Sequence, residues 1–182
     1  NVKKKIYFII GLSNKIGSGH FFRSMCLAKH LKTSGIEIFL ISYDPSIRLF
    51  LNKTSNQRIF KKIFILKNNF EEKSFFKKNE ISNLYIDNPK IGLQKQLFFS
   101  KNSKNIIIYQ DEPKKSFANI IINHNYIPDV TRKYRKLVSV NTKLLLGIQY
   151  FPIDFKKIFV KKSKKKQIKS ITIFFGSQDR KS

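Results

Sequence analysis

The residues best suited to chemistry lie in a glycine-rich segment near the start of the chain. Gly17 and Gly19 precede His20 and Arg23, after an apolar run and at the opening of a helical pattern. Glycines let a ligand approach the backbone, and the N–H groups at a helix start favour anionic oxygens. A neutral imidazole can act as a base near pH 7. Arg23 falls on the same helix face as His20. The spacing predicts a site for a phosphate-bearing substrate at a strand's carboxyl end.

The same segment also has a plainer interpretation. The two glycines can serve only a tight turn and His20 can cap or pack, because a short glycine–histidine motif is weak by itself. Cys26 is the single cysteine. We expect it to be buried with Phe22 on the stripe that faces the core of the helix. One cysteine fits a reducing compartment, and without ligand-spaced partners it supports neither a metal site nor a cofactor.

Other ionisable residues have two open interpretations each. Asp87 and Asp111 follow apolar runs and can accept hydrogen bonds from a substrate hydroxyl or cap a helix. His124 lies between two asparagines after another apolar run, where it can face a cleft or belong to a plain loop. His30 lies mid-helix beside lysines and is expected at the surface.

Apolar, β-branched runs that alternate with helical patterns must position these residues. The alternation predicts an α/β fold with a Rossmann-like parallel sheet and flanking helices. We expect strands at residues 6–12, 36–42, 63–66, 84–87, 105–109, 119–122 and 144–147. We expect helices at residues 21–33, 45–51 and 70–78, and within 91–100.

The pattern breaks at residues 156–169, a lysine-rich stretch that indicates a solvated linker. Residues 170–175 then resemble one more strand, followed by a glycine loop. We therefore expect a Rossmann-like catalytic domain at residues 1–155, a linker at 156–169, and the truncated start of a C-terminal nucleotide-binding domain at 170–182.

Composition excludes several classes of protein. The 182 residues include 18 Phe and are 41% hydrophobic, which is too apolar for a disordered chain. The formal charge is +26, but the lysines are spread throughout, so we expect nonspecific attraction to polyanions and no specific nucleic-acid function. No segment approaches the roughly 20 apolar residues of a membrane span. The sequence predicts a soluble, cytoplasmic protein.

Taken in order, these motifs resemble a known enzyme family. Residues 16–23 are similar to the N-terminal signature of the UDP-2,4-diacetamido-2,4,6-trideoxy-β-L-altropyranose hydrolases of pseudaminic acid biosynthesis. These are related to spore-coat polysaccharide proteins and MurG-type glycosyltransferases. Weaker similarities follow at the expected intervals, at residues 84–88, 108–112, 121–125, 146–150 and 174–179. Together they span essentially the whole chain, which would be about the first half of a family member.

The resemblance implies two Rossmann-like domains in the glycosyltransferase-B arrangement, with the UDP-sugar between them. His20 would be the base that activates water, UDP would leave, and no metal would be needed. The implied substrate-binding residues are Gly17, Gly19, Arg23, Asp87, Asp111, Asn123 and Tyr150, and the implied nucleotide-binding residues are Gly176 and Ser177.

Some positions depart from the family pattern. Ile9 and Gly11 stand where an Arg-x-Asp pair is expected, Pro89 lies where a tyrosine is expected, and Gln110 replaces the first acid of the paired acids. Two alternatives therefore stand beside the hydrolase: a glycosyltransferase of the same fold, and a degenerate, non-catalytic sugar-nucleotide-binding domain. Without its nucleotide-binding domain, a fragment is expected to be inactive.

Overall fold

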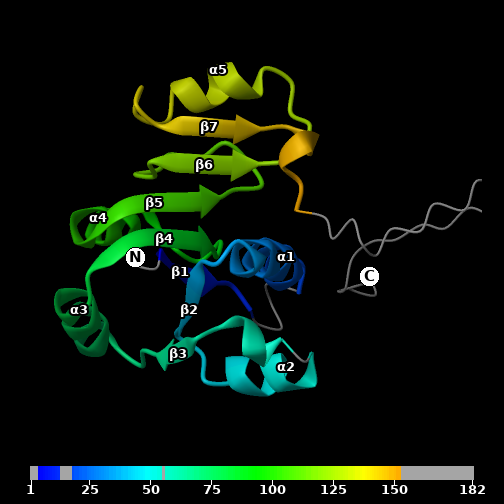
Figure 1. The fold of residues 1–182 in the computed structure, drawn as a ribbon. Coiled ribbons are helices and arrows are strands. Elements are labelled where there is room, and N and C mark those ends of the chain that lie inside the picture. Colours follow the sequence, from blue (N-terminus) through cyan, green and yellow to red (C-terminus); the bar gives the residue numbers. More distant parts are fainter. Residues whose placement is uncertain (1–3, 13–17, 55, 153–182) are drawn as a thin grey trace, which may run out of the picture.

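The computed structural model describes residues 4–12, 18–54 and 56–152. They form one seven-stranded sheet with every neighbouring pair parallel, in the order β3-β2-β1-β4-β5-β6-β7 (Figure 1). The strands are β1 Lys5–Ile10, β2 Glu37–Ser42, β3 Lys62–Ile65, β4 Ile81–Asp87, β5 Ser103–Tyr109, β6 Ile120–Asn123 and β7 Lys143–Leu146. This confirms the predicted α/β, Rossmann-like fold.

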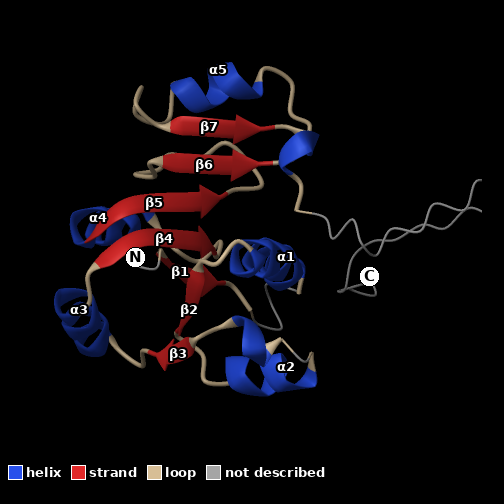
Figure 2. Cartoon of the chain, viewed as in Figure 1, coloured by secondary structure: helices blue, strands red, loops and turns tan. Residues whose placement is uncertain are grey.

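Helices cover both faces of the sheet (Figure 2). One hydrophobic cluster joins one face to α1 and α2, and a second joins the other face to α3, α4 and α5. The helices are α1 Gly19–Thr33, α2 Ile47–Lys53, α3 Asn69–Lys78, α4 Leu93–Asn102 and α5 Val130–Arg135, with 3-10 turns at Gln57–Ile59 and Ile148–Tyr150. The structure is therefore a three-layer α/β/α sandwich.

Side-chain alternation along the strands assigns residues to the two layers. In β1, Phe8 and Ile10 face the layer of α1 and α2, whereas Tyr7 and Ile9 face the layer of α3 and α4. All four are almost fully buried. A central parallel strand is covered on both sides, so its sequence is continuously apolar, which is why β1 was recognisable.

Helix α1 lies in a different rotational phase from the predicted one. The residues that it buries are Phe21, Ser24, Met25 and Ala28. Phe22 is 51% exposed, so its predicted burial was wrong. Cys26 is only partly buried. The shift by one residue arises because Phe21 fills the space between β1 and α2, where it packs edge-on against Phe50.

The strand order reverses between β1 and β4, which creates a topological switch point at the carboxyl edge of the sheet. Gly11 follows β1 there, and its N–H donates to the carbonyl oxygen of Asp87, 2.8 Å away. A Cβ on Gly11 would lie 3.2 Å from the Cα of Asn88 and 3.2 Å from Cδ of Pro89. The chain therefore has little room for the aspartate that the family pattern places at this position.

The connection from β5 to β6 crosses the sheet without a helix. Residues 110–119 return along the α4 face, and Gln96 of α4 accepts hydrogen bonds from Ser116 Oγ at 2.9 Å and the Phe117 N–H at 3.3 Å. The following helix, α5, was not predicted from the sequence. Its fully buried Tyr134 fixes it to the sheet.

The two edges of the sheet are short. Strands β3 and β7 have four residues each and begin with Lys62 and Lys143. The predicted linker and C-terminal strand lie outside the described residues, as do Gly17, Gly176 and Ser177. Within the described part of the chain, no helix is long and apolar enough to span a membrane.

Candidate functional site

Four ionisable residues meet at the switch point, and Arg23 lies at their centre. Its Nε donates to Asp87 Oδ2 at 2.6 Å, and its Nη2 donates to Asp87 Oδ1 at 2.6 Å. Its Nη1 donates to Asp111 Oδ1 at 2.5 Å. Nη2 also lies 2.8 Å from Nδ1 of His20. All three guanidinium nitrogens are thus occupied by neighbours inside the protein.

Asp87 anchors this cluster from the end of β4. Its side chain is fully buried. It faces α1 because Tyr85, two residues earlier, packs in the same layer as α1. Besides Arg23, its carboxylate accepts a hydrogen bond from Ser24 Oγ at 3.1 Å and lies 2.7 Å from His20 Nδ1. Asp87 therefore acts on the site through His20 and Arg23, and it caps no helix.

His20 lies in the first turn of α1 with its side chain 16% exposed. One ring nitrogen, Nδ1, lies 2.7 Å from Asp87 Oδ1 and 2.8 Å from Arg23 Nη2. The other, Nε2, lies 4.0 Å from Asp111 Oδ2. The imidazole therefore has one anchored nitrogen and one that faces the open carboxyl edge of the sheet.

Electrostatics keep Arg23 and Asp111 charged. Burial alone would lower the pKa of Arg23, but its hydrogen bonds to Asp87 and Asp111 outweigh burial and raise that pKa. Burial alone would raise the pKa of Asp111, but hydrogen bonds from Arg23 and its positive charge lower it below the ordinary value. The cluster holds one fixed cation between two carboxylates.

A cavity of about 340 Å³ opens beside His20. It combines apolar residues of the β4–α4 turn with polar side chains from the end of β5. The lining residues are His20, Asn88, Pro89, Ile91, Gly92, Leu93, Gln96, Tyr109, Gln110, Asp111, Lys114 and Lys115. Cavities of this size and mixed polarity at a switch point are typical of small-molecule sites.

Gln110 contributes an unusual group to this cavity. Its side chain is 9% exposed, and among the described residues its Oε1 has no hydrogen-bond partner. A buried acceptor without a partner costs about 1–3 kcal/mol. In the sequence, Gln110 stands out only because it replaces an acidic residue of the family pattern. The structure places it in the wall of the candidate site.

Two further residues extend the cluster, and sequence reasoning did not assign them to it. The Arg23 guanidinium lies over the ring of Tyr109, 4.1 Å from its centroid. The Tyr109 hydroxyl is 2.6 Å from Nδ1 of His124. Strand alternation was the available signal, because Tyr109 lies two residues from Asp111 and on the α1 face of β5.

The other predicted site residues in the described part of the chain are Asn123, Tyr150 and Gly19, and none of them lines the cavity beside His20. Asn123 is fully buried, and its side chain holds Tyr134 Oη at 3.0 Å and the Asn125 N–H at 2.9 Å. Tyr150 is 39% exposed in the turn after β7 and does not line the cavity. Gly19 starts α1, and a Cβ there would meet no atom within 4 Å. Substrate contacts of these three residues stay predictions.

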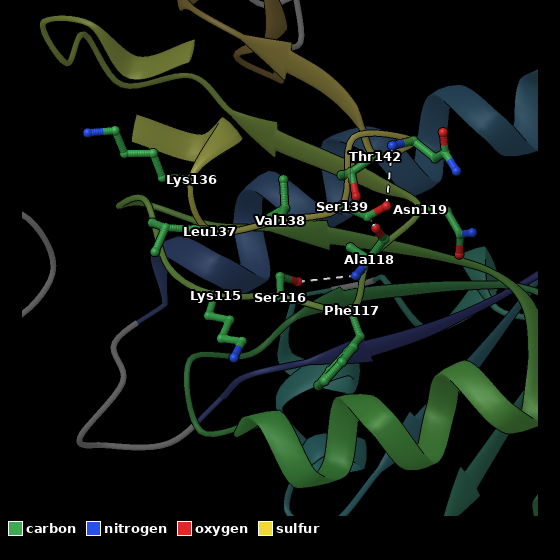
Figure 3. Close-up of a pocket in the computed structure, with 11 residues that line it drawn as sticks. Lys115, Ser116, Phe117, Ala118, Asn119, Lys136, Leu137, Val138, Ser139 and Thr142 are labelled. Atoms are coloured by element: carbon green, nitrogen blue, oxygen red, sulfur yellow. Dashed lines mark hydrogen bonds between the residues drawn. The ribbon is translucent and has the colours of Figure 1, made fainter. Parts of the chain in front are cut away.

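A second hollow, of about 450 Å³, lies at the amino edge of β6 and β7, away from His20 (Figure 3). Several of its polar groups are already paired within the protein: Thr142 Oγ1 donates to the Ala118 carbonyl at 2.9 Å, and Ser116 Oγ accepts from the Ala118 N–H at 3.3 Å. Lys115 and Lys136 leave the backbone in different directions. No convergent set of ligand-binding groups is formed by these residues.

Among the described residues, no three His, Cys, Asp or Glu side chains gather in a way that could hold a metal ion. At the switch point, Arg23 already occupies the space between the two carboxylates. The cluster is therefore an arginine-centred ion-pair network.

Comparisons with known proteins add no independent assignment to this geometry. No protein-family model matches the chain, and no curated protein matches it significantly. The family suggested by its motifs therefore stays a prediction.

Proposed function

We propose that this chain is the N-terminal, catalytic half of a hydrolase that cleaves a UDP-linked deoxyamino sugar to free sugar and UDP, in pseudaminic acid biosynthesis. The observation that carries the proposal is the imidazole of His20, which is anchored at Nδ1 by buried Asp87 and lines the cavity. This is the arrangement that a general base requires.

The contact with Asp87 favours one tautomer of His20. A carboxylate can only accept, so a proton on Nδ1 makes a charge-assisted hydrogen bond to Asp87 at 2.7 Å. Arg23 Nη2 can only donate, so in this tautomer it makes no hydrogen bond to Nδ1 and acts on His20 through its two hydrogen bonds to Asp87. Nε2 then carries the lone pair.

Water can be held between two acceptors. Nε2 of His20 and Oδ2 of Asp111 are 4.0 Å apart, so one water molecule can hydrogen-bond to both at about 2.8 Å. In the proposed step the water oxygen attacks the anomeric carbon while its proton moves to Nε2. The bond from the anomeric carbon to the phosphate oxygen breaks, and its electron pair leaves with UDP.

The phosphates need another cation, because Arg23 is occupied by carboxylates. Lys114 and Lys115 line the same cavity and are exposed. A lysine binds phosphate as a point charge rather than as a bidentate fork. We assign these two lysines to the diphosphate and Arg23 to the orientation of His20, and the further nucleotide contacts to a C-terminal nucleotide-binding domain.

The test is an assay with UDP-2,4-diacetamido-2,4,6-trideoxy-β-L-altropyranose. Two proteins are assayed: the chain alone, and the chain joined to any C-terminal continuation of its gene. Released UDP and free sugar are quantified in each assay. His20→Ala should lower turnover by about 10²–10⁴-fold. His30→Ala, at an exposed position of the same helix, is the control and should retain full turnover. Acceptor-dependent turnover would instead indicate a glycosyltransferase.

A non-catalytic binding domain is the second candidate. It is favoured by the crowding at Gly11, which leaves little room for the acidic residue expected there. This candidate predicts that His20→Ala leaves the dissociation constant for the UDP-sugar unchanged and that the unaltered protein has no turnover.

A further inference from the structure

The Arg23 guanidinium is held from two directions. Its edges donate to Asp87 and Asp111, and its flat face lies over the ring of Tyr109, 4.1 Å from the centroid. The carboxylates fix where the nitrogens point. The Tyr109 ring, which belongs to strand β5, holds the guanidinium from the side of the sheet, since a cation is attracted to the face of an aromatic ring.

Tyr109 is in turn held by His124. The Tyr109 hydroxyl and His124 Nδ1 are 2.6 Å apart, and the two ring centroids are 5.6 Å apart. Phe151 packs against the imidazole, with ring centroids at 4.5 Å. Tyr109 is 5% exposed, so its hydroxyl has few alternative partners. His124 therefore selects one orientation of the Tyr109 ring.

We propose that His124 is a positioning residue, which acts through the Tyr109 ring to hold the Arg23 guanidinium in register with His20 and Asp87. It touches no substrate in this role. The chain of contacts runs from His124, which follows β6, to Tyr109 on β5 and then to Arg23 on α1, so three segments of the chain share one ordered unit.

Charge supports this role for a neutral imidazole. Burial, followed by the positive charge of Arg23, lowers the pKa of His124, and the carboxylates of Asp111 and Asp87 oppose this only in part. With its proton on Nε2, neutral His124 accepts a hydrogen bond from the Tyr109 hydroxyl at Nδ1 and adds no second cation beside Arg23. The tyrosine hydroxyl stays protonated, because burial raises the pKa of Tyr109.

The test compares two substitutions at one position. Asn carries a side-chain acceptor close to the place of Nδ1, whereas Val carries none. His124→Asn should therefore retain the hold on Tyr109, and His124→Val should lose it. His30→Ala, at an exposed position of α1, is the matched control for loss of an imidazole. Tyr109→Phe keeps the ring beneath Arg23 and removes only the hydroxyl.

The readout is the Arg23 Nε–H signal in NMR spectra of the isotope-labelled chain. In the unaltered protein this proton should be shifted by the Tyr109 ring current and should exchange slowly with water, because it is donated to buried Asp87. In His124→Val and Tyr109→Phe its exchange should be faster by about tenfold, with a changed chemical shift. His124→Asn and the control should match the unaltered protein.

Several outcomes would overturn the proposal. One is an Arg23 signal that stays the same in His124→Val, and another is a signal that changes equally in His124→Asn. If His124→Val does not fold, Tyr109→Phe decides the matter in the same way. A double variant that combines His124→Val with Tyr109→Phe should change the Arg23 signal no more than the larger single effect, because both substitutions break the same chain of contacts.

The consequence for catalysis rests on the proposed function. In a hydrolase, His124→Val should lower kcat and leave KM unchanged, while His124→Asn restores kcat. Absence of turnover in the chain joined to any C-terminal continuation of its gene would refute the hydrolase and leave the NMR result intact. The two ideas can therefore fail separately.

Discussion

Arg23 is the residue on which the candidate site depends. It contacts His20, Asp87, Asp111 and the ring of Tyr109, and all of its nitrogens are used within the protein. Such a fully paired guanidinium orients its neighbours, but it does not offer a ligand a free bidentate pair of N–H donors. In the proposed hydrolase, the contacts with the substrate would come from Nε2 of His20 and the wall of the cavity.

Asp87→Asn tests the buried ion pair. The substitution keeps the shape of the side chain and removes the charge that balances Arg23. Breaking a buried pair in this way should lower the free energy of unfolding by about 3–5 kcal/mol, measured by urea denaturation. Glu80→Gln is the control, because Glu80 pairs with Lys104 at the surface, where both side chains are exposed. Equal urea midpoints for the two variants would contradict the buried pairing.

His124 should make stability depend on pH. Its pKa in the folded protein is lowered, by burial first and then by Arg23, from an unfolded value of about 6.5. The unfolded state therefore binds more protons between the two values. Stability is complete above the unfolded pKa and is lost as pH falls through about 6.5 toward the folded value.

The comparison with His124→Asn isolates this effect. Urea unfolding measured from about pH 7.5 to about pH 5.5 should show a smaller loss of stability in His124→Asn than in the unaltered chain. Asp111, whose pKa is lowered mainly by Arg23 against burial, should affect both proteins alike and only at more acidic pH. Parallel curves for the two proteins would rule out a half-buried, neutral His124.

Single residues also show where sequence reasoning reached its limit. The types and spacing of His20 and Arg23 were enough to predict that both lie at the carboxyl edge. The sequence left two interpretations of His124 open and implied a substrate contact for Asn123; in the structure His124 contacts Tyr109 and Asn123 contacts Tyr134, because one step along the chain at the end of β6 reverses the direction of the side chain. The face of β6 that looks toward α1 follows from tertiary packing, which the sequence of a four-residue strand does not reveal.

At the scale of elements, rotational phase decides which residues of α1 reach the sheet. The helix was predicted close to its observed bounds, but the apolar pattern of two adjacent phenylalanines fits either phase. Phe21 is fully buried and Phe22 is 51% exposed. The same phase turns His20, Arg23 and Ser24 toward Asp87.

A pair of alanine substitutions tests this phase. Phe21→Ala should lower the free energy of unfolding by about 3–5 kcal/mol, because it opens a cavity between α1, β1 and α2. Phe22→Ala should cost less than about 1 kcal/mol, since half of the side chain is already in solvent. Thermal or urea unfolding of both variants measures the difference. A reversed order of the two costs would show that the helix is rotated.

The strands were the most predictable elements and the crossover before β6 the least. Continuous apolar runs mark buried parallel strands, so all seven were expected to within a few residues. Residues 110–119 carry no helical pattern, and their path is set by hydrogen bonds that Ser116 and Phe117 donate to Gln96 of α4. Helix α5 is short and is held by a single buried tyrosine, which leaves no periodic signal.

At the scale of the whole molecule, charge and fold act separately. The formal charge of +26 comes from lysines spread over the chain, and the sheet core contains almost none of it. The charge raises the local concentration of any anion near the surface. The candidate site differs from the rest of the charged surface because His20 lines a cavity there.

Binding to DNA should therefore be nonspecific. Anisotropy of two unrelated fluorescent duplexes should report similar affinities at about 50 mM salt and a steep loss of both by about 500 mM, because only phosphate contacts are formed. Tight binding of one duplex that persists at high salt would instead identify a specific nucleic-acid interface.

The two borders of the sheet have a consequence for the behaviour of the protein in concentrated solution. Open edges of parallel sheets present unpaired N–H and C=O groups that can recruit a strand from another molecule. Here β3 and β7 offer only four residues each, and Lys62 and Lys143 lie at their starts. A neighbouring molecule thus finds a short and positively charged margin to extend, which works against fibre-like aggregation even in a fold so rich in isoleucine and phenylalanine.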